Sequence, residues 1–455
     1  MSLSRYCKIY PYREDHDSVI LFSTKKASII LLQESMIEDI REGAISEEEK
    51  EILVGLGFLV DDVDEEKTGM LSVIEELNTI SRTFRAVVVL NLDCNLACAY
   101  CFEGTRKGGF YMTLETADLF VDFVKDKINA SFPVATLITG CEGGFPEKNI
   151  APFEEIEIVF YGGEPLLSAG LIEYISGRIK IFSDRKGISY SFSLITNGTL
   201  LLPKIVERLK PFGFTGAGVT LDGAKEIHDV FRPFRSGKGS FDTIVKNIKD
   251  VCDMIEVDIG GNYTQDNYTA FPGLLDYLLG EGLTPGKIPR IMFNPVTRES
   301  AEFAPPDFHE GCETINEPWL LDAVIFLREE ILRRGYRTQK IIPSVCMVEF
   351  RNSLVVNYDG SIYKCPGFIG RERFCVGDLN AGVGDYGFSH NLDSWKNEEC
   401  LDCVYLPVCF GGCRYMKFVR EGNIDGVDCK KIYFDATLGK LVDQDIRYGL
   451  KVGGY

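Results

Sequence analysis

Three cysteines in one short loop constrain this chain more than any other feature. Within NLDCNLACAYCFEG, residues 91–104, Cys94, Cys98 and Cys101 form a C-x3-C-x2-C pattern. A filled [4Fe–4S] cube needs four cysteine ligands, so three closely spaced thiolates can hold three irons and leave the fourth without a protein ligand. The pattern therefore predicts an iron that is open to a small molecule. A zinc knuckle or a disulfide pair is the alternative, but zinc sites commonly pair two C-x2-C motifs and no partner pair lies nearby.

The composition is that of a globular protein with metal or redox chemistry. The 455 residues are 45% hydrophobic and 26% charged, and the chain is long enough for two or three domains. No run approaches about 18 apolar residues and residues 1–30 lack a signal-peptide pattern, so we expect no membrane span and a cytoplasmic protein. A net charge of −19 excludes nucleic acid as a partner, because phosphates would be repelled. Fifteen cysteines without a secretion signal favour metal binding over disulfides.

Apolar strand-like runs alternate with amphipathic helical segments from residue 84 to about 297. The strand-like runs are 84–92, 156–161, 189–196, 216–221, 257–262 and 290–295, and the helical stretches are 114–129, 171–184, 203–210, 240–254 and 274–282. Alternating units of this length predict a parallel sheet with helices outside it. The cysteine loop follows the first run, at the end of a strand where barrel enzymes carry their chemistry.

With Tyr100 just before its last cysteine, the triad resembles the motif of the radical S-adenosylmethionine (SAM) superfamily. The resemblance implies a partial (β/α)6 barrel. It also implies that the amine and carboxylate of SAM chelate the open iron. An electron from an external low-potential donor, passed through the reduced cluster, would then cleave the sulfonium and yield a 5′-deoxyadenosyl radical.

A motif after the second strand resembles the SAM-amine site of the same superfamily. Gly162 and Gly163 would let the backbone approach a ligand closely, and the Glu164 carboxylate could accept from an ammonium group. Asn197 closes the third strand. Its amide suits ribose hydroxyls, but an ordinary Asn-Gly turn would look the same.

The fourth strand leads into VTLDG, residues 219–223, and then into a segment with His228 and Arg232, close to the VSLDG…HDxxR pattern of peptide-maturing enzymes. Thr220 stands where that pattern has serine. The resemblance implies that Thr220 and Arg232 hold the methionine carboxylate, a sensible partner for a hydroxyl and a guanidinium. A surface ion pair is the alternative for Arg232, and His228 is taken as structural.

A second cysteine pattern lies in the C-terminal part of the chain. It reads C-x13-G-x4-C, then C-x2-C-x5-C-x3-C, then a last cysteine, and comprises Cys346, Cys365, Cys400, Cys403, Cys409, Cys413 and Cys429. This spacing resembles the SPASM domain, which carries two auxiliary [4Fe–4S] clusters, so the chain would hold three clusters. The resemblance assigns Cys400, Cys403, Cys409 and Cys429 to the distal cluster, and Cys346, Cys365 and Cys413 to three irons of the proximal one. A zinc ribbon at Cys400 and Cys403 is the chemical alternative.

Two departures from the sulfatase-maturing relatives affect the expected chemistry. Those relatives have an additional cysteine where this chain has Lys340. Either Cys375 is therefore the fourth proximal ligand, or an iron stays open to bind a substrate thiolate, and we favour the open iron. The same relatives follow the equivalent of Cys365 with an aspartate thought to deprotonate the substrate, and here that residue is Pro366. Sulfatase-type formation of formylglycine is thus disfavoured.

Residues 1–80 are expected to form a separate N-terminal unit. Short β-rich runs at 6–12, 18–24 and 27–32 precede helical segments at 35–41 and 46–56, where Ser46 and Glu49 form a capping-box pattern. The run 58–60 would close the unit before the acidic stretch 61–66. This order resembles the winged-helix leader-peptide recognition element, which adds a peptide as an extra strand at a sheet edge. The alternative is a packing extension without a ligand.

Together these patterns make the chain resemble the radical SAM/SPASM peptide maturases that modify ribosomally made peptides, and within them the geopeptide maturases. The expected parts are the N-terminal unit at 1–80, the barrel at 84–300, a bridging helical region at 301–340 and the SPASM domain at 341–455. The implied reaction forms a thioether in a small cysteine-containing precursor peptide. A carbon–carbon or ether cross-link, or a non-catalytic metal-binding scaffold, is the alternative.

The loop 139–153 looks like an insertion over the barrel mouth, and Cys7, Cys141, Cys252 and Cys312 are expected to be small buried hydrophobes.

Replacing Cys375 with alanine tests the open proximal iron. Three cubes give on the order of 12 Fe per chain, and we expect Cys375→Ala to keep both this iron content and the EPR signal of the proximal cluster. The measurement is iron analysis and EPR on anaerobically purified protein. Loss of the proximal cluster in the variant would make Cys375 its fourth ligand, and a colourless zinc protein would contradict the clusters altogether.

Overall fold

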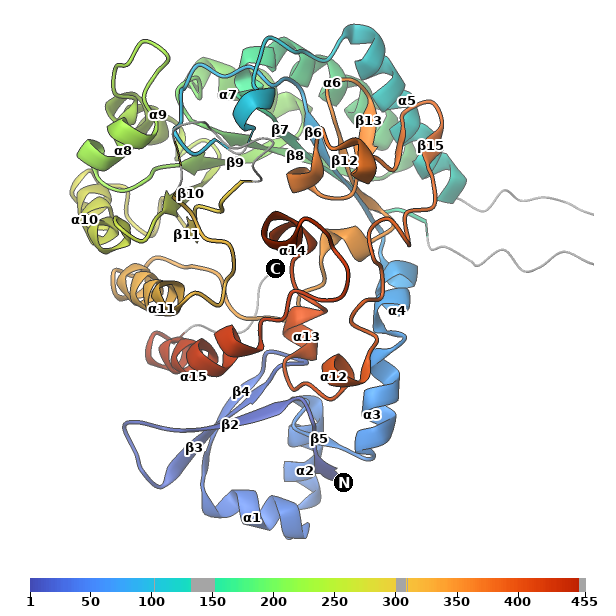
Figure 1. Cartoon of the computed structure of the whole chain (residues 1–455), viewed down its shortest axis with the longest axis vertical. Coiled ribbons are helices and arrows are strands. Elements are labelled where there is room, and N and C mark those ends of the chain that lie inside the picture. The colour runs from blue at the N-terminus through green and yellow to red at the C-terminus, as the bar shows by residue number, and fades with distance from the viewer. Residues whose placement is uncertain (102, 132–151, 300–307, 309, 450–455) are drawn as a thin grey trace, which may run out of the picture.

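The computed structural model describes residues 1–101, 103–131, 152–299, 308 and 310–449. The N-terminal unit lies at one end of the molecule and the large sheet with its helices at the other, and the C-terminal segment fills the space between them (Figure 1). Within these described residues, no helix is both long and apolar enough to cross a membrane. Most of the insertion predicted at 139–153 lies outside the described residues, as does Cys141.

The predicted parallel sheet is confirmed. Its strands are β6 (Thr83–Val89), β7 (Glu155–Tyr161), β8 (Ser189–Thr196), β9 (Phe214–Thr220), β10 (Glu256–Tyr263) and β11 (Ile291–Pro295), each parallel to the next. The helices between them are α5 (Leu114–Ser131), α6 (Ala169–Lys186), α7 (Pro203–Leu209), α8 (Lys225–Phe231), α9 (Phe241–Val251) and α10 (Phe271–Gly280). Alternate residues of each strand, such as Ile156, Ile158 and Phe160 of β7, join the helices in one apolar core. The fold is thus α/β with a large, mostly parallel sheet.

The C-terminal segment continues this sheet, which the sequence did not predict. Strand β12 (Ser353–Val356) pairs in parallel with β6, from Ser353 opposite Arg85 to Val356 opposite Val88. Strands β13 (Ser361–Tyr363), β14 (Gly377–Asp378) and β15 (Gly382–Val383) then add in antiparallel order. Strand β6 is therefore paired along its second edge with β12, which lies more than 260 residues later in the chain.

The N-terminal unit contains the predicted strands and helices. Strands β2 (Cys7–Pro11), β3 (Ser18–Ser23) and β4 (Ile29–Gln33) form an antiparallel sheet, and β1 (Ser2–Leu3) pairs with β5 (Leu59–Val60). Helices α1 (Ser35–Glu42) and α2 (Glu47–Gly55) follow, and the capping box of Ser46 and Glu49 is present at the start of α2. The acidic stretch after β5 continues into helices: Asp62 caps α3 (Val63–Met70), and α4 (Val73–Ile80) then leads to β6. Helices α3 and α4 run along one side of the molecule (Figure 1).

The helices of the C-terminal half connect the N-terminal unit to the large sheet. They are α11 (Pro318–Arg333), α12 (Glu398–Leu401), α13 (Leu406–Cys409), α14 (Arg414–Glu421) and α15 (Lys431–Arg447). On one face of the N-terminal sheet, Ile20 and Phe22 of β3 pack against Tyr433, Phe434 and Leu438 of α15. Their neighbours Val19 and Leu21 face α1 and α2 instead. Strand β3 is buried on both faces, so the N-terminal unit is packed firmly onto the C-terminal segment.

Candidate functional site

The cysteine loop begins where β6 ends and is held by close backbone contacts with the loop after β7. The amide of Gly163 donates to the carbonyl of Asn91 (3.0 Å), and the amide of Glu164 donates to that of Asp93 (2.8 Å). A Cβ on Gly162 would lie 2.2 Å from the Asn91 oxygen, and one on Gly163 would lie 2.1 Å from the Asp93 oxygen. Both glycines are therefore required by the approach of the cysteine loop itself, where the sequence suggested only the approach of a ligand.

The middle of the cysteine loop pairs with the segment that follows α8. Ala97 donates to the Pro233 carbonyl (2.8 Å), Ala99 donates to that of Phe231 (3.0 Å), and Arg235 donates back to that of Asn95 (3.0 Å). This short antiparallel pairing places Arg232 beside the cysteines, although more than 130 residues separate them in the sequence.

Tyr100 is fixed by polar groups at the ends of β9 and β10. Its hydroxyl donates to the carboxylate of Asp222 and accepts from Arg232 Nη1 (2.8 Å) and from Asn262 Nδ2 (3.1 Å). The Arg232 guanidinium lies 3.8 Å from Asp222, whose pKa is raised because burial outweighs that positive charge. The aromatic residue of the cysteine motif therefore ties the loop to the barrel strands.

His228 supports the same network from below, in the structural role expected from the sequence. Its Nδ1 accepts from the amide of Asp222 (3.1 Å), so Nε2 carries the hydrogen and donates to Ser240 Oγ (3.0 Å). Ser240 in turn donates to the Arg232 carbonyl (2.7 Å). The imidazole is fully buried, and this environment holds it neutral.

Glu164 and Asn197 make their hydrogen bonds within the protein. We expected the Glu164 carboxylate to face a ligand, but it is fully buried and accepts from Thr196 Oγ1 (2.8 Å), the Asn197 amide (2.8 Å) and the Leu166 amide (3.0 Å). Asn197 Nδ2 donates to Asn95 Oδ1 (2.8 Å), and Asn197 Oδ1 accepts from the Thr199 amide (2.9 Å), as a turn-forming asparagine does. The two side chains brace the ends of β7 and β8 against the cysteine loop.

One cavity of about 550 Å³ brings most of the predicted cofactor residues together. Its lining includes Cys94, Cys98, Tyr100, Cys101, Gly162, Gly163, Asn197, Thr220 and Arg232, but not Glu164. Arg232 Nε is buried and has no hydrogen-bond partner among the described residues. An unpartnered guanidinium nitrogen in a cavity with three thiols and a hydroxyl suits a ligand that carries a carboxylate. The residues present therefore fit the cluster and SAM that the sequence implies.

The three thiols differ in their surroundings. Cys94 Sγ accepts from the Leu96 amide (3.4 Å) and from Asn197 Nδ2 (3.6 Å), although burial still raises its pKa. Burial raises the pKa of Cys98 to about 11, against the lowering effect of Arg232. Within the described residues, no group of three or more His, Cys, Asp or Glu side chains has the spacing that would hold a single metal ion. The thiolates of a cube bind different irons, so a cluster does not require that spacing.

Several of the seven C-terminal cysteines lie close enough to affect one another's pKa. Burial, and then the neighbouring Cys413 and Cys346 thiols, raise the pKa of Cys365 to about 12. The pKa of Cys400 is raised by burial and by Cys403 and Cys429, and that of Cys409 is raised by burial and also by Cys400. Cys365 is thus coupled to Cys346 and Cys413, and Cys400 to Cys403, Cys409 and Cys429, while the assignment of these thiols to two clusters stays a prediction. The Cys375 thiol donates to the Gly377 carbonyl (3.3 Å).

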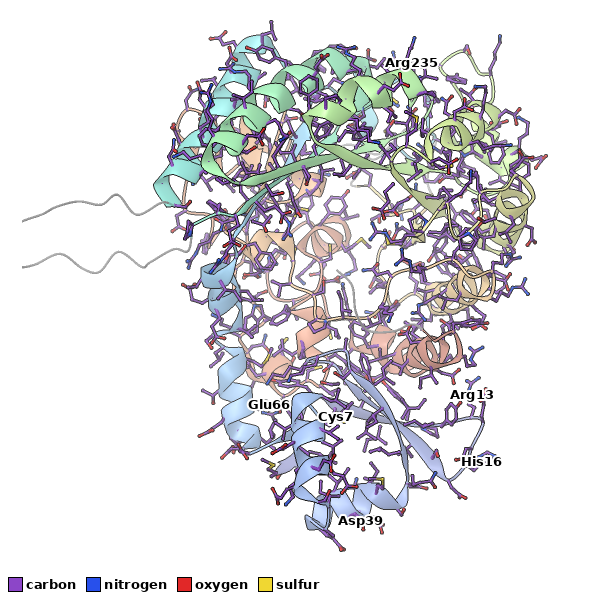
Figure 2. All side chains as sticks on the ribbon, turned by 180° about the vertical axis from the view of Figure 1, so that it is seen from behind. Cys7, Arg13, His16, Asp39, Glu66 and Arg235 are labelled. Atoms are coloured by element: carbon purple, nitrogen blue, oxygen red, sulfur yellow. The ribbon has the colours of Figure 1, made fainter. Side chains whose placement is uncertain are left out.

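Of the remaining cysteines, Cys252 and Cys312 are buried in apolar clusters, as expected. Cys7 packs partly buried in the N-terminal unit, at the opposite end of the molecule from Arg235 beside the cysteine loop (Figure 2). None of the cysteines in the described ranges forms a disulfide.

The cavity also contains residues that sequence reasoning missed. Its lining includes Glu103, Lys107, Tyr161 and Asn262 on the side of the parallel sheet. From the C-terminal segment it is lined by Gly367 and Tyr415, next to Pro366, which the sequence had already singled out. Glu103 is 4% exposed, and burial raises its pKa to about 7. Its place two residues after Cys101 was the available signal, as was the place of Asn262 at the end of a predicted strand.

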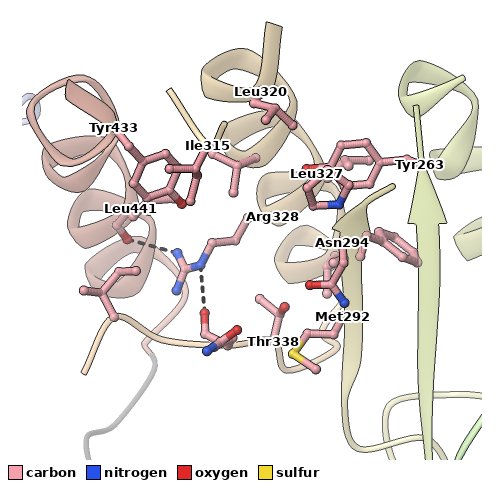
Figure 3. A pocket seen from close by; sticks show the side chains of 16 residues that line it. Tyr263, Met292, Asn294, Ile315, Leu320, Leu327, Arg328, Thr338, Tyr433 and Leu441 are labelled. Atoms are coloured by element: carbon pink, nitrogen blue, oxygen red, sulfur yellow. Dashed lines mark hydrogen bonds between the residues drawn. The ribbon is translucent and has the colours of Figure 1, made fainter. Parts of the chain in front are cut away.

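A second cavity, of about 230 Å³, lies between β11, α11 and α15 (Figure 3). It shares Pro295 with the first cavity, and its wall is mainly apolar, with Ile315, Leu320, Leu327 and Leu441 among its residues. The guanidinium of Arg328 points across it but donates to the Leu441 and Gln339 carbonyls (Figure 3). It also donates to the Asp445 carboxylate. This cavity therefore presents no unpaired guanidinium to a ligand.

The sequence is similar to those of known proteins over the region that contains the cysteine loop. Residues 88–276 match the model of the Radical SAM superfamily. This part of the chain is therefore similar to a radical SAM domain. The chain is 25% identical over 381 residues to the cysteine-type anaerobic sulfatase-maturating enzyme of Clostridium novyi (strain NT), a match that covers 77% of this chain and 93% of that enzyme.

Two solved structures have the same fold. The structure of native anSMEcpe with bound AdoMet matches with a TM-score of 0.59 and 18% identity, over 80% of this chain and 98% of that one. Streptococcus suis SuiB bound to the precursor peptide SuiA matches with a TM-score of 0.53 and 16% identity, over 95% of this chain and 99% of that one. These two matches show that the fold of this chain is similar to that of both structures.

Gly163→Ala tests the backbone contact that holds the cysteine loop. The added Cβ cannot fit against the Asp93 carbonyl, so we expect a loss of about 1–3 kcal/mol in stability and reduced iron binding by the triad. Melting temperature and iron content after reconstitution measure the two effects. Gly170→Ala is the matched control, because its Cβ would meet only the Arg208 side chain at 3.7 Å. Normal iron content in Gly163→Ala would contradict the assigned role.

His228 gives stability a defined pH dependence. Burial lowers its pKa to about 3, whereas that of an unfolded histidine is about 6.5. Its contribution to the free energy of unfolding is therefore complete above about pH 6.5 and is lost toward about pH 3, with a slope of up to about 1.4 kcal/mol per pH unit.

His228→Asn keeps an acceptor near the Asp222 amide but does not titrate in this range. The fall in melting temperature between about pH 7 and about pH 5 should be smaller in His228→Asn than in the unsubstituted protein. Differential scanning fluorimetry on both proteins measures it. An equal fall in the two proteins would show that His228 is not the titrating group.

Proposed function

We propose that this chain is a radical SAM enzyme that forms a thioether in a ribosomally made, cysteine-rich peptide. The observation that carries the proposal is a single cavity lined both by the radical SAM cysteines and by residues of the C-terminal cysteine segment. Pro366 directly follows Cys365, and Tyr415 lies two residues after Cys413. A substrate in this cavity would therefore lie between two cysteine sets.

The residues of the cofactor site have different roles. Cys94, Cys98 and Cys101 hold the cluster and leave one iron open for SAM. Arg232 and Thr220 bind the carboxylate of SAM, and the unpartnered Arg232 Nε supports this role. The backbone at Gly162 and Gly163 lies against the ligand, while Tyr100, Asn197 and Glu164 hold the surrounding loops in place.

The C-terminal cysteines hold two auxiliary clusters. Cys346, Cys365 and Cys413 form the proximal set beside the cavity, and Cys400, Cys403, Cys409 and Cys429 form the distal set. When bound, SAM with its cluster supplies the radical that removes a hydrogen atom, and the auxiliary clusters supply an electron acceptor. The protein's own task is to position one C–H bond and one cysteine thiol together and to exclude water.

The atoms of the proposed reaction balance, but one electron must still be removed from the product. A C–H and an S–H bond are lost and a C–S bond forms. One hydrogen atom leaves with 5′-deoxyadenosine, and the thiol releases its proton. An acceptor must take the remaining electron. An auxiliary cluster held by the C-terminal cysteines, across the cavity from the radical SAM cysteines, would be that acceptor.

The N-terminal unit is proposed to bind the precursor peptide. Its sheet ends in two edge strands, β2 and β4, and β4 carries the exposed Leu31. An extended peptide could add to such an edge through backbone hydrogen bonds. The likeness to SuiB, solved with the precursor peptide SuiA, extends over 95% of this chain and supports a peptide substrate.

Sulfatase maturation is the second candidate, because the relative from Clostridium novyi is matched over 93% of its length. Pro366 argues against it, since it lines the cavity and has no titrating group where the sulfatase-maturing relatives have an aspartate. A carbon–carbon or ether cross-link remains a further alternative within the same enzyme class.

The test is to co-express the enzyme with a small cysteine-containing peptide encoded beside its gene and to analyse the peptide by mass spectrometry. A thioether removes about 2 Da per cross-link and also protects the cysteine from alkylation by iodoacetamide. The assay also measures 5′-deoxyadenosine. Cys94→Ala is the control and should abolish both products.

The alternatives give different products. A carbon–carbon or ether cross-link would lose the same mass but leave the thiol open to alkylation. An aldehyde that reacts with a hydrazide would indicate sulfatase-type oxidation. Formation of neither 5′-deoxyadenosine nor a modified peptide would contradict the proposed enzyme.

A further inference from the structure

Glu103 is a buried carboxyl group in the wall of the reaction cavity that has no task in the cofactor site. Its side chain is 4% exposed, and its Oε2 atom has no hydrogen-bond partner among the described residues. It precedes the short 3-10 turn Gly104–Arg106 but caps none of its amides. A buried, unpartnered polar atom costs about 1–3 kcal/mol, so a ligand that supplies the partner explains its presence.

Two cations, Lys107 and Arg106, lie near enough to Glu103 to oppose the effect of burial on its pKa, but its Oε2 atom accepts no hydrogen bond from the described residues. The nearby polar side chains of the cavity donate hydrogen bonds elsewhere. Lys107 donates to the Leu96 carbonyl (2.9 Å), Arg232 donates to Tyr100 (2.8 Å), and Tyr415 donates to Glu299 (2.7 Å). None of these three bonds is directed at Glu103. Its Oε2 therefore remains available as an acceptor.

The wall formed by the C-terminal segment has few free hydrogen-bonding groups for a polar substrate. Pro366 has no N–H group, and the carbonyl of Gly367 accepts from Arg371 Nη1 (2.8 Å). A peptide between these two walls would find its open hydrogen-bond acceptor on the barrel side, close to Cys101.

We propose that Glu103 binds the substrate peptide through a hydrogen bond from an N–H or O–H group beside the reacting carbon. This rests on the proposed function and adds a specificity-determining residue to it. Glu103 then decides which C–H bond faces the radical, because a fixed donor on the peptide sets the register of its neighbours. The partner is a backbone amide or a polar side chain of the peptide.

Glu103→Ala and Glu103→Gln test this proposal in the cluster-loaded enzyme with the peptide substrate. We expect Glu103→Ala to raise KM about tenfold, which corresponds to about 1.4 kcal/mol. It should also form more 5′-deoxyadenosine per modified peptide, since a loosely held substrate lets the radical be quenched. Glu103→Gln keeps an acceptor oxygen and should recover part of both effects. Glu207→Ala, on the exposed face of α7, is the matched control.

Stability gives a readout that needs no peptide. The effect of burial on the Glu103 carboxyl group outweighs the attraction of the neighbouring Lys107 and Arg106, so the melting temperature of Glu103→Ala should be unchanged or raised. A lowered melting temperature would show that Glu103 is a structural residue and would overturn the proposal.

The kinetic outcomes are also decisive. Unchanged KM and unchanged coupling in Glu103→Ala would overturn the proposal while leaving the proposed function intact. Loss of iron or of SAM binding in the variant would assign Glu103 to the cofactor site instead. Failure of the unsubstituted enzyme to modify any peptide would overturn the proposed function, and the role of Glu103 with it.

Discussion

The site depends on the close backbone contact between the loop after β7 and the start of the cysteine loop. Gly162 and Gly163 lie so near the carbonyls of Asn91 and Asp93 that any side chain would collide with them. Glu164 and Asn197 then brace this contact through buried hydrogen bonds. Three thiols can share one cavity because the loop that carries them is held at both of its sides, by these glycines and by the segment after α8.

A chain of charged and hydroxyl groups extends this support into the barrel. Tyr100 joins the cysteine loop to Asp222 and Asn262. His228 accepts a hydrogen bond directly from the Asp222 amide and supports the Arg232 carbonyl through Ser240. Because these groups are buried, each needs its partner, and loss of one would leave another unsatisfied. Among the described residues, nothing bonds to Arg232 Nε within this otherwise bonded network, and this is the observation on which its proposed binding role rests.

The parallel strands could be predicted because they depend on local patterns. Apolar runs marked β7 and β8 to within a residue, whereas the cysteine sets inferred from spacing, such as Cys400 and Cys403, stay predictions. The pairing of β12 with β6 could not be predicted, since it joins segments far apart in the sequence. The internal role of Glu164 was missed for the same reason, because its partner Thr196 belongs to another strand. Glu103 carries no motif, and only its burial without a partner makes it noticeable.

Because β12 continues the sheet from β6, the C-terminal segment is an integral strand of the barrel and not an attached lid. Val355 and Val356 are fully buried there, and Val355 packs with Val89, the last residue of β6, from which the cysteine loop departs. A chimera that exchanged everything after residue 340 with a homologue would therefore replace the strand that pairs with β6, from which the cysteine loop departs. Such an exchange would change the support of that loop together with the C-terminal cysteines, so these two parts of the chain are expected to diverge together among related proteins.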